Sequence, residues 1–177
     1  MNNEEYEKIV NNVYPGLTHY VRDMDLDEEL INKYKVNDII LERTFTDCTS
    51  LISGLTKNVR YSIFSNDAHY IGELKNSRAP LVHILDLDSV FKVLDVYKKD
   101  NKTLITLLHI PFEYINIFKK VSNNLDEMAI KQARKRFEDC LNSKIISEFD
   151  DEWYKRTSFP LGMTEDGKMF PLEKRKD

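Results

Sequence analysis

Short runs rich in β-branched and aromatic residues follow one another through the middle of this 177-residue chain. Polar turns separate them, and neighbouring runs are spaced about ten residues apart. This spacing leaves no room for a crossover helix between most of the runs, so it predicts an α+β protein with an antiparallel sheet rather than a doubly wound parallel one. The predicted strands cover residues 38–45, 58–64, 69–74, 81–85, 91–97 and 103–110, and the last two form a predicted hairpin.

Helices are predicted on both sides of this β-rich middle. Apolar residues recur with helical spacing in residues 4–13, and an acidic stretch at residues 23–29 leads into a second short helix. A long helix is expected over residues 124–146, because an apolar stripe runs along it. Residues 153–172 combine many large apolar groups with few polar ones, so they predict an irregular packed tail with a turn at residues 165–167.

These patterns divide the chain into two parts. We expect an α+β domain with flanking N-terminal helices at residues 1–110, and a mainly helical C-terminal extension at residues 111–177.

Composition excludes several classes of protein. Hydrophobic residues make up 41% and charged residues 32% of the chain, which is typical of a soluble globular protein. Lys and Arg number 26 against 30 Asp and Glu, and a net charge of -4 gives no overall field for binding a polyanion. No run is long enough to cross a membrane, and no secretory signal is visible. We therefore expect a cytoplasmic protein.

The cysteines and histidines predict no metal site. Cys48 and Cys140 lie far apart in the sequence without metal or redox spacing, and the four histidines are scattered. The Asp-x-Asp-x-Asp pattern at residues 23–27 lacks the glycine and the distal glutamate of a calcium loop. Both thiols are expected to be free in a reducing compartment.

Four segments together resemble the mono-ADP-ribosyltransferase fold over about residues 13–110. Residues 13–17 resemble the first strand of that family, where Tyr-Arg-Gly-Leu is usual, and residues 34–50 resemble the stretch that ends in Phe-x-Ser-Thr-Ser. Residues 81–96 resemble the Glu-x-Glu segment, and residues 103–110 the closing strand. The resemblance implies a split antiparallel sheet that clamps NAD, with an arginine on the phosphates, a serine bracing a glutamate, and the second glutamate stabilising the charge that develops on the ribose.

The catalytic signatures implied by this resemblance are degenerate. Pro15 stands at the arginine position, residues 47–49 replace Ser-Thr-Ser, and residues 81–83 replace Glu-x-Glu, with His83 in place of the second glutamate. A proline cannot neutralise phosphate, and an imidazole cannot replace a carboxylate opposite a developing cation. If the alignment is displaced by a few residues, the cation and the carboxylate come instead from these side chains: Arg22 or Arg43, and Asp86 or Asp88.

Few residues remain as candidates for an active site. The catalytic candidates are His83, Asp47 and Thr49, and the cofactor-binding candidates are Tyr14, Thr46, Thr49 and Ser50. Each also has a purely structural interpretation, because hydroxyl-rich strand ends commonly satisfy turns and a histidine in an apolar run commonly belongs to a core.

The leading hypothesis is a catalytically degenerate ADP-ribosyltransferase-like module that binds or regulates a protein partner without a cofactor. Its partner-binding candidates are Lys131, Arg134 and Lys135 on the basic helix and Trp153 in the tail. One alternative is an atypical NAD-dependent mono-ADP-ribosyltransferase effector of phage or bacterial type. A third is a nucleic-acid-binding accessory protein that uses the basic helix at residues 124–146.

Overall fold

An eight-stranded sheet organises the computed structural model, which describes residues 3–71, 81–119, 124–145, 149 and 151–173. The strand order is β2-β7-β8-β4-β1-β3-β6-β5. The strands are β1 (Thr18–Met24), β2 (Ile39–Glu42), β3 (Thr46–Thr49), β4 (Val59–Ser65), β5 (His69–Tyr70), β6 (Val82–Leu85), β7 (Ser89–Lys99) and β8 (Lys102–Ile110). The helical segments are α1 (Asn3–Val13), α2 (Glu28–Ile31), η1 (Phe112–Tyr114), α3 (Ile115–Phe118), α4 (Asn124–Leu141) and α5 (Asp151–Arg156).

The predicted α+β class and the predicted hairpin are confirmed. Strands β7 and β8 pair antiparallel from Lys99↔Lys102 to Val90↔Ile110. Asp100 and Asn101 connect them with φ angles of 51° and 60°, and this left-handed pair matches the twist of a tight hairpin. Most other strand pairs are antiparallel as well, but β4 runs parallel to β8, a pairing that the sequence did not predict.

The first strand differs from the prediction in position. The resemblance placed it at residues 13–17, whereas β1 covers Thr18–Met24 and Pro15 lies in the turn that precedes it. The acidic stretch at residues 23–29 begins at the end of β1, and it leads into a second short helix as predicted, with Glu28 and Glu29 in the first turn of α2. Asp27 caps this short helix by accepting a 2.8 Å hydrogen bond from the Leu30 backbone nitrogen.

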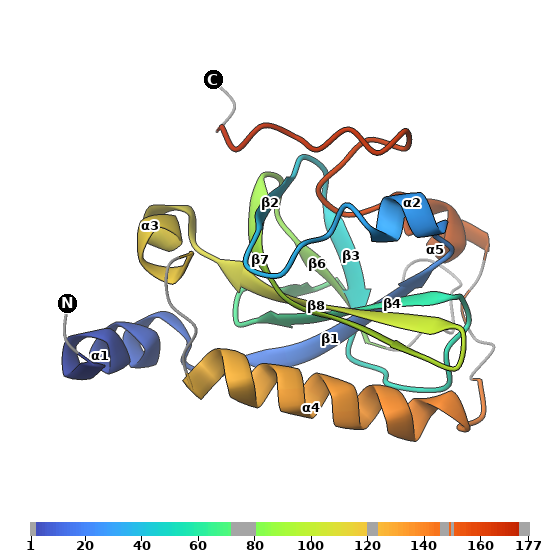
Figure 1. The fold of residues 1–177 in the computed structure, drawn as a ribbon, viewed down its shortest axis with the longest axis horizontal. Coiled ribbons are helices and arrows are strands. Elements are labelled where there is room, and N and C mark those ends of the chain that lie inside the picture. The colour runs from blue at the N-terminus through green and yellow to red at the C-terminus, as the bar shows by residue number, and fades with distance from the viewer. Residues whose placement is uncertain (1–2, 72–80, 120–123, 146–148, 150, 174–177) are drawn as a thin grey trace.

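The sheet divides into two arms where β1 meets β3. Val21↔Thr49 is the one paired position between these strands, whereas β1 pairs with β4 along its whole length. On one side of the split lie β3, β6 and the short edge strand β5, and on the other lies the long arm with β7 and β8. Figure 1 shows β3 and β6 turned steeply away from the direction of β1, β4 and β8.

Each face of the long arm is covered by a different part of the chain. Helix α4 runs along one face, where Ala133 and Phe137 belong to the same apolar core as Leu104 and Leu108. On the opposite face Leu161 and Met163, from the C-terminal segment, pack with Tyr61 and other side chains of the sheet. Figure 1 shows the C-terminal segment crossing above the sheet while α4 lies beneath it. The C-terminal extension thus completes both cores.

Candidate functional site

The most unusual group of polar side chains lies beneath the segment that follows α5, which we call the strap (residues 157–163). Side chains alternate along β1, so Tyr20, Arg22 and Met24 face the strap while His19 and Val21 face the side of α4. The strap crosses the first of these two faces beside the split between the arms. Two of its residues, Leu161 and Met163, are almost completely buried there.

Arg22 is a buried cation held by the strap. Its side chain is only 3% exposed, and one terminal nitrogen donates a 2.6 Å hydrogen bond to the carbonyl of Phe159. Its Nε has no hydrogen-bond partner among the described residues, and no described carboxylate lies within ion-pair distance. Burial lowers the pKa of Arg22, although Tyr61 and Glu42 oppose the shift. The Phe159 carbonyl therefore occupies the position at which an anion would otherwise bind this guanidinium.

Directional bonds hold the strap on the sheet. Tyr34 Oη donates to the Leu161 carbonyl at 2.7 Å, and the Gly162 backbone nitrogen donates to Glu42 Oε2 at 2.8 Å. Arg156, at the end of α5, forms an ion pair with Asp47. Gly162 has a φ of +81°, and a Cβ at this position would lie 2.8 Å from Cβ of Ile40, so the approach requires glycine.

His83 lies on the shorter arm, between two tyrosine rings. Its ring centroid is 4.8 Å from that of Tyr20 and 5.4 Å from that of Tyr70. Nδ1 contacts the carbonyl of Leu81 at 2.8 Å, and since a carbonyl only accepts, Nδ1 carries the proton and donates. The register places His83 opposite Cys48 of β3.

The hydroxyl-rich candidates on β3 are used within the fold. Thr49 Oγ1 donates to the Leu81 carbonyl at 3.2 Å and accepts from the Leu51 backbone nitrogen at 3.0 Å. Asp47 is buried beside Arg156, and burial raises its pKa even though the arginine acts in the opposite direction. Thr46 is fully buried, and its hydroxyl has no hydrogen-bond partner among the described residues. Burial also raises the pKa of the Cys48 thiol, so it stays protonated and poorly nucleophilic.

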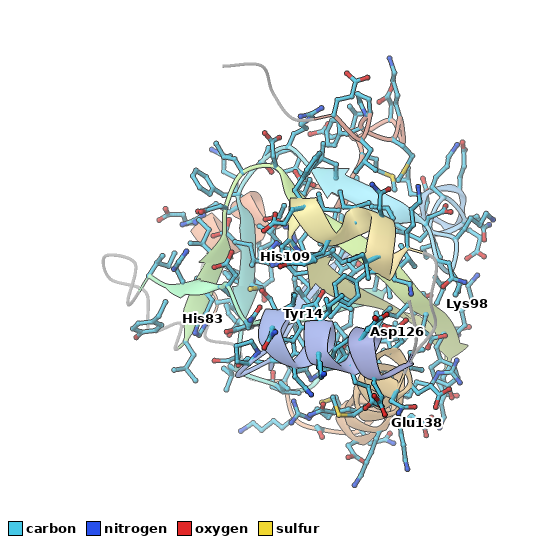
Figure 2. All side chains as sticks on the ribbon, turned by 90° about the vertical axis from the view of Figure 1, so that its left-hand side faces the viewer. Tyr14, His83, Lys98, His109, Asp126 and Glu138 are labelled. Atoms are coloured by element: carbon cyan, nitrogen blue, oxygen red, sulfur yellow. The ribbon has the colours of Figure 1, made fainter. Side chains whose placement is uncertain are left out.

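The remaining cofactor candidates do not join this group. Tyr14 Oη donates to the carbonyl of His109 at 3.0 Å, and Figure 2 shows these two residues close together with His83 well to one side. Ser50 lines a separate pocket next to α4. The structure therefore brings residues 46–49 and His83 onto neighbouring strands but leaves Tyr14 and Ser50 elsewhere.

The predicted partner-binding residues have different surroundings. Lys131, Arg134 and Lys135 are exposed on α4, although Arg134 also forms two 2.7 Å hydrogen bonds to Asp95. Trp153 is only 4% exposed, because it packs with Val82 and stacks on Phe149 at a centroid distance of 4.6 Å. As a core anchor of α5 it is not available to a partner in this conformation.

Sequence reasoning missed the tyrosine pair and Glu42. Arg22 was a candidate only if the alignment with the family was displaced by a few residues. The first strand begins five residues later than the resemblance placed it, and Arg22 therefore lies on β1. Tyr34 entered as the first residue of the segment at residues 34–50 that resembles the family, and no local pattern links it to Tyr61 or to the strap. Gly162, within the apolar tail, was the available sequence signal of a close backbone approach.

With the strap in place the polar side chains of this group are engaged by the chain itself. Phe159 occupies the hydrogen-bonding position on Arg22, and Glu42 and Asp47 are engaged by Gly162 and Arg156. Within the described part of the chain, no cluster of three or more His, Cys, Asp or Glu side chains is arranged to hold a metal ion. None of the described helices combines the length and apolar character that a membrane span requires.

Several solved ADP-ribosyltransferase structures are similar to this chain. The Vis toxin from Vibrio splendidus is 17% identical over 63% of this chain and 56% of its own, with a TM-score of 0.45. HopU1 of Pseudomonas syringae is 19% identical over 53% of this chain and 45% of its own, with a TM-score of 0.46. C3larvin from Paenibacillus larvae is 12% identical over 60% of this chain and 68% of its own, with a TM-score of 0.46.

The likeness is confined to the fold. The chain spans about half the length of the Vis and HopU1 structures. No family model matches the sequence, and no curated protein matches it. The resemblance to mono-ADP-ribosyltransferases that the sequence predicted is confirmed as a similarity of structure.

Proposed function

We propose that this chain is a binding or regulatory module with an ADP-ribosyltransferase-like fold that engages a protein partner instead of transferring ADP-ribose. The observation that supports this most directly is the hydrogen bond from buried Arg22 to the Phe159 carbonyl. A ligand that used Arg22 would have to displace the strap, with its bonds to Tyr34 and Glu42. In this proposal the protein works without a cofactor and acts in the cytoplasm.

The outer face of α4 is the surface that we assign to the protein partner. Lys131, Arg134 and Lys135 are all exposed there. A row of cations on an acidic protein favours a partner with an acidic surface, because opposite potentials steer association. Trp153 is left out of this surface because it is buried.

A titration with NAD tests the proposal. We expect no change in the melting temperature of the purified chain at millimolar NAD and no release of nicotinamide. Ligand at a hundred times its dissociation constant stabilises a protein by about 2.7 kcal/mol, which would raise the melting temperature of a chain of this size by several degrees. A shift accompanied by nicotinamide release would refute the proposal.

The second candidate is an atypical NAD-dependent mono-ADP-ribosyltransferase effector. It is favoured by the presence of Arg22 and the carboxylate of Glu42 under the same strap, since movement of the strap would uncover a cation and a carboxylate together. Gly162→Ala, which loosens the strap, should then create NAD binding that the original chain lacks. Gly16→Ala is the matched control, because Gly16 also has a positive φ of 70° but has no atom within 4 Å of an added Cβ.

Nucleic-acid binding through the helix predicted at residues 124–146 stays a prediction. If it occurs, affinity should fall steeply with salt concentration, because each phosphate contact releases counterions.

A further inference from the structure

Most of the arginines that the structure describes are paired with carboxylates, and two of them are not. Among the described residues, four arginines form ion pairs with aspartates: Arg43, Arg60, Arg134 and Arg156. Arg22 is instead bound by the strap on one face of the sheet. Arg136 lies on α4 at the opposite face, and within the described chain its charge has no carboxylate partner at ion-pair distance.

A buried histidine fixes the position of Arg136. A terminal nitrogen of the Arg136 guanidinium donates to Nδ1 of this histidine, His19, at 2.8 Å. Because a guanidinium only donates, Nδ1 is unprotonated, and His19 Nε2 therefore carries the proton and donates to Ser62 Oγ at 3.0 Å. The imidazole also stacks on Phe64, with ring centroids 4.6 Å apart and planes 5° apart. The histidine is thus held on three sides.

The charge of Arg136 remains uncompensated because His19 stays neutral. Burial, followed by the nearby charges of Arg136 and Arg60, lowers the pKa of His19 to about 3. A neutral imidazole orients the guanidinium without cancelling its charge. Arg136 is therefore a pre-positioned cation, and a ligand that binds it loses little side-chain entropy in doing so.

The cation borders an open pocket of about 430 Å³ between β1, α4 and the loop after β3. Polar lining groups come from Thr18, Ser50 and Gln132, and apolar ones come from Leu17 and Ile52. None of the acidic side chains that the structure describes lines the pocket. Its volume falls in the range of small-molecule sites, which span roughly 300–1,000 Å³.

The loop that forms one wall is anchored. The Gly54 backbone nitrogen donates to the Lys144 carbonyl at 3.2 Å, and a Cβ at Gly54 would lie 2.3 Å from the Ser143 carbonyl oxygen. The Thr56 backbone nitrogen also donates to Asp23 at 2.9 Å. The pocket wall is therefore fixed against the end of α4 rather than free in solvent.

We infer that this pocket binds the phosphoryl group of a small phosphomonoester. Arg136 supplies a fixed fork of donors, and the amide of Gln132 and the hydroxyls of Thr18 and Ser50 supply neutral donors around it. Leu17 and Ile52 provide apolar surface for the organic part of the ligand. The site is separate from Arg22 and the strap, because His19 and Arg22 point to opposite faces of β1.

Calorimetric titration of the full chain tests this site. The probes are inorganic phosphate, ribose 5-phosphate and adenosine 5′-monophosphate, with adenosine as the probe that lacks a phosphate, all at one ionic strength. We expect the two phosphomonoesters to bind more tightly than inorganic phosphate and adenosine not to bind. Binding of adenosine as tight as that of its monophosphate, or binding of inorganic phosphate alone, would overturn the inference.

Neighbouring variants separate a specific site from general attraction to positive charge. Arg136→Gln should weaken phosphomonoester binding by about tenfold or more, the effect of losing a charge-assisted hydrogen bond. Lys135→Gln removes the same charge one residue away on the exposed side of α4 and should change affinity less than about twofold. Gln132→Ala should weaken binding severalfold without disturbing His19, which keeps the test valid if the Arg136 variant is unstable. Equal losses in the Arg136 and Lys135 variants would contradict a built site.

Discussion

The hydroxyl oxygens of Tyr34 and Tyr61 lie 2.6 Å apart, and together they close a ring of hydrogen bonds on the backbone of Leu161. The Leu161 nitrogen donates to Tyr61 Oη at 3.3 Å, and Tyr34 Oη donates to the Leu161 carbonyl at 2.7 Å. Tyr61 must therefore donate to Tyr34, since each hydroxyl has one proton. The strap is bound to the sheet by directional groups as well as by apolar contact.

Removing one hydroxyl from this ring should destabilise the protein. Tyr61→Phe leaves buried polar groups of Tyr34 and Leu161 with fewer partners, and we expect a loss of about 1–3 kcal/mol in the free energy of unfolding. Urea unfolding measures the loss, and Tyr34→Phe with the double variant completes a cycle. Tyr70→Phe, at a ring that is 59% exposed, should change stability by less than about 0.5 kcal/mol. Additive losses in the cycle would contradict a coupled ring.

Gly162→Ala should loosen the strap specifically. The added Cβ meets Ile40 at 2.8 Å in a backbone conformation with φ of +81°, so we expect a loss of roughly 1–3 kcal/mol. Trypsin should then cleave after Lys155 and Arg156 faster under native conditions, as mass spectrometry of the fragments would show. Gly16→Ala carries similar backbone strain without the clash and should leave those cleavage rates unchanged. Equal cleavage in the two variants would argue against a strap held by close packing.

The ion pair between Lys92 and Asp126 should be sensitive to loss of one partner. Lys92 Nζ lies 2.7 Å from Asp126 Oδ2, and both side chains are at most 4% exposed. Lys92→Met leaves a buried carboxylate without its cation, which typically costs about 3–5 kcal/mol. Lys98→Met, at an exposed pair with Glu28, should cost less than about 1 kcal/mol. Chemical denaturation of the two variants compares them, and similar losses would contradict the assigned burial.

Two buried histidines should make the protein less stable in mild acid. Burial lowers the pKa of His19 from 6.5 to about 3 and that of His109 to about 4. Between these values and 6.5 the unfolded chain binds more protons than the folded one, so the free energy of unfolding decreases as the pH falls below 6.5. Each site contributes a decrease of about 1.4 kcal/mol per pH unit within that window.

Variants of these histidines test the pH dependence. For His19→Gln or His109→Gln the difference in unfolding free energy between pH 7 and pH 5 should be smaller than in the original chain by roughly 2 kcal/mol. Urea titrations at the two pH values provide the measurement. If replacing a histidine leaves the difference in unfolding free energy between pH 7 and pH 5 unchanged, that histidine is protonated in the folded state of the original chain at pH 5.

Local patterns identified much of the architecture. Alternation and turn residues predicted the hairpin of β7 and β8, and the apolar stripe predicted α4, because each signal is carried by residues within a few turns or strand positions of one another. The turn at residues 165–167 is also present, where the Gly167 nitrogen donates to the Thr164 carbonyl at 2.9 Å. The free, buried state of Cys48 and Cys140 agrees with their unrelated spacing.

The candidate site depended on contacts that no local pattern contains. Arg22 reaches Phe159 across 137 positions in the chain, and Tyr34 reaches Leu161 across 127. Asp47 was a candidate because of its type and position, yet its surroundings are set by Arg156, 109 residues away. Partners at such separations are chosen by the pairing of strands and the path of the strap.

The sequence by itself determined the β-rich middle and the long helix, since composition and periodicity act over short distances. Only the tertiary structure decided that β1 begins at Thr18, that the strap binds Arg22, and that Arg136 is fixed by His19 without a carboxylate. The physical reason is that the charge state and partners of a side chain are set by which surfaces are buried together, and burial is a property of the whole chain.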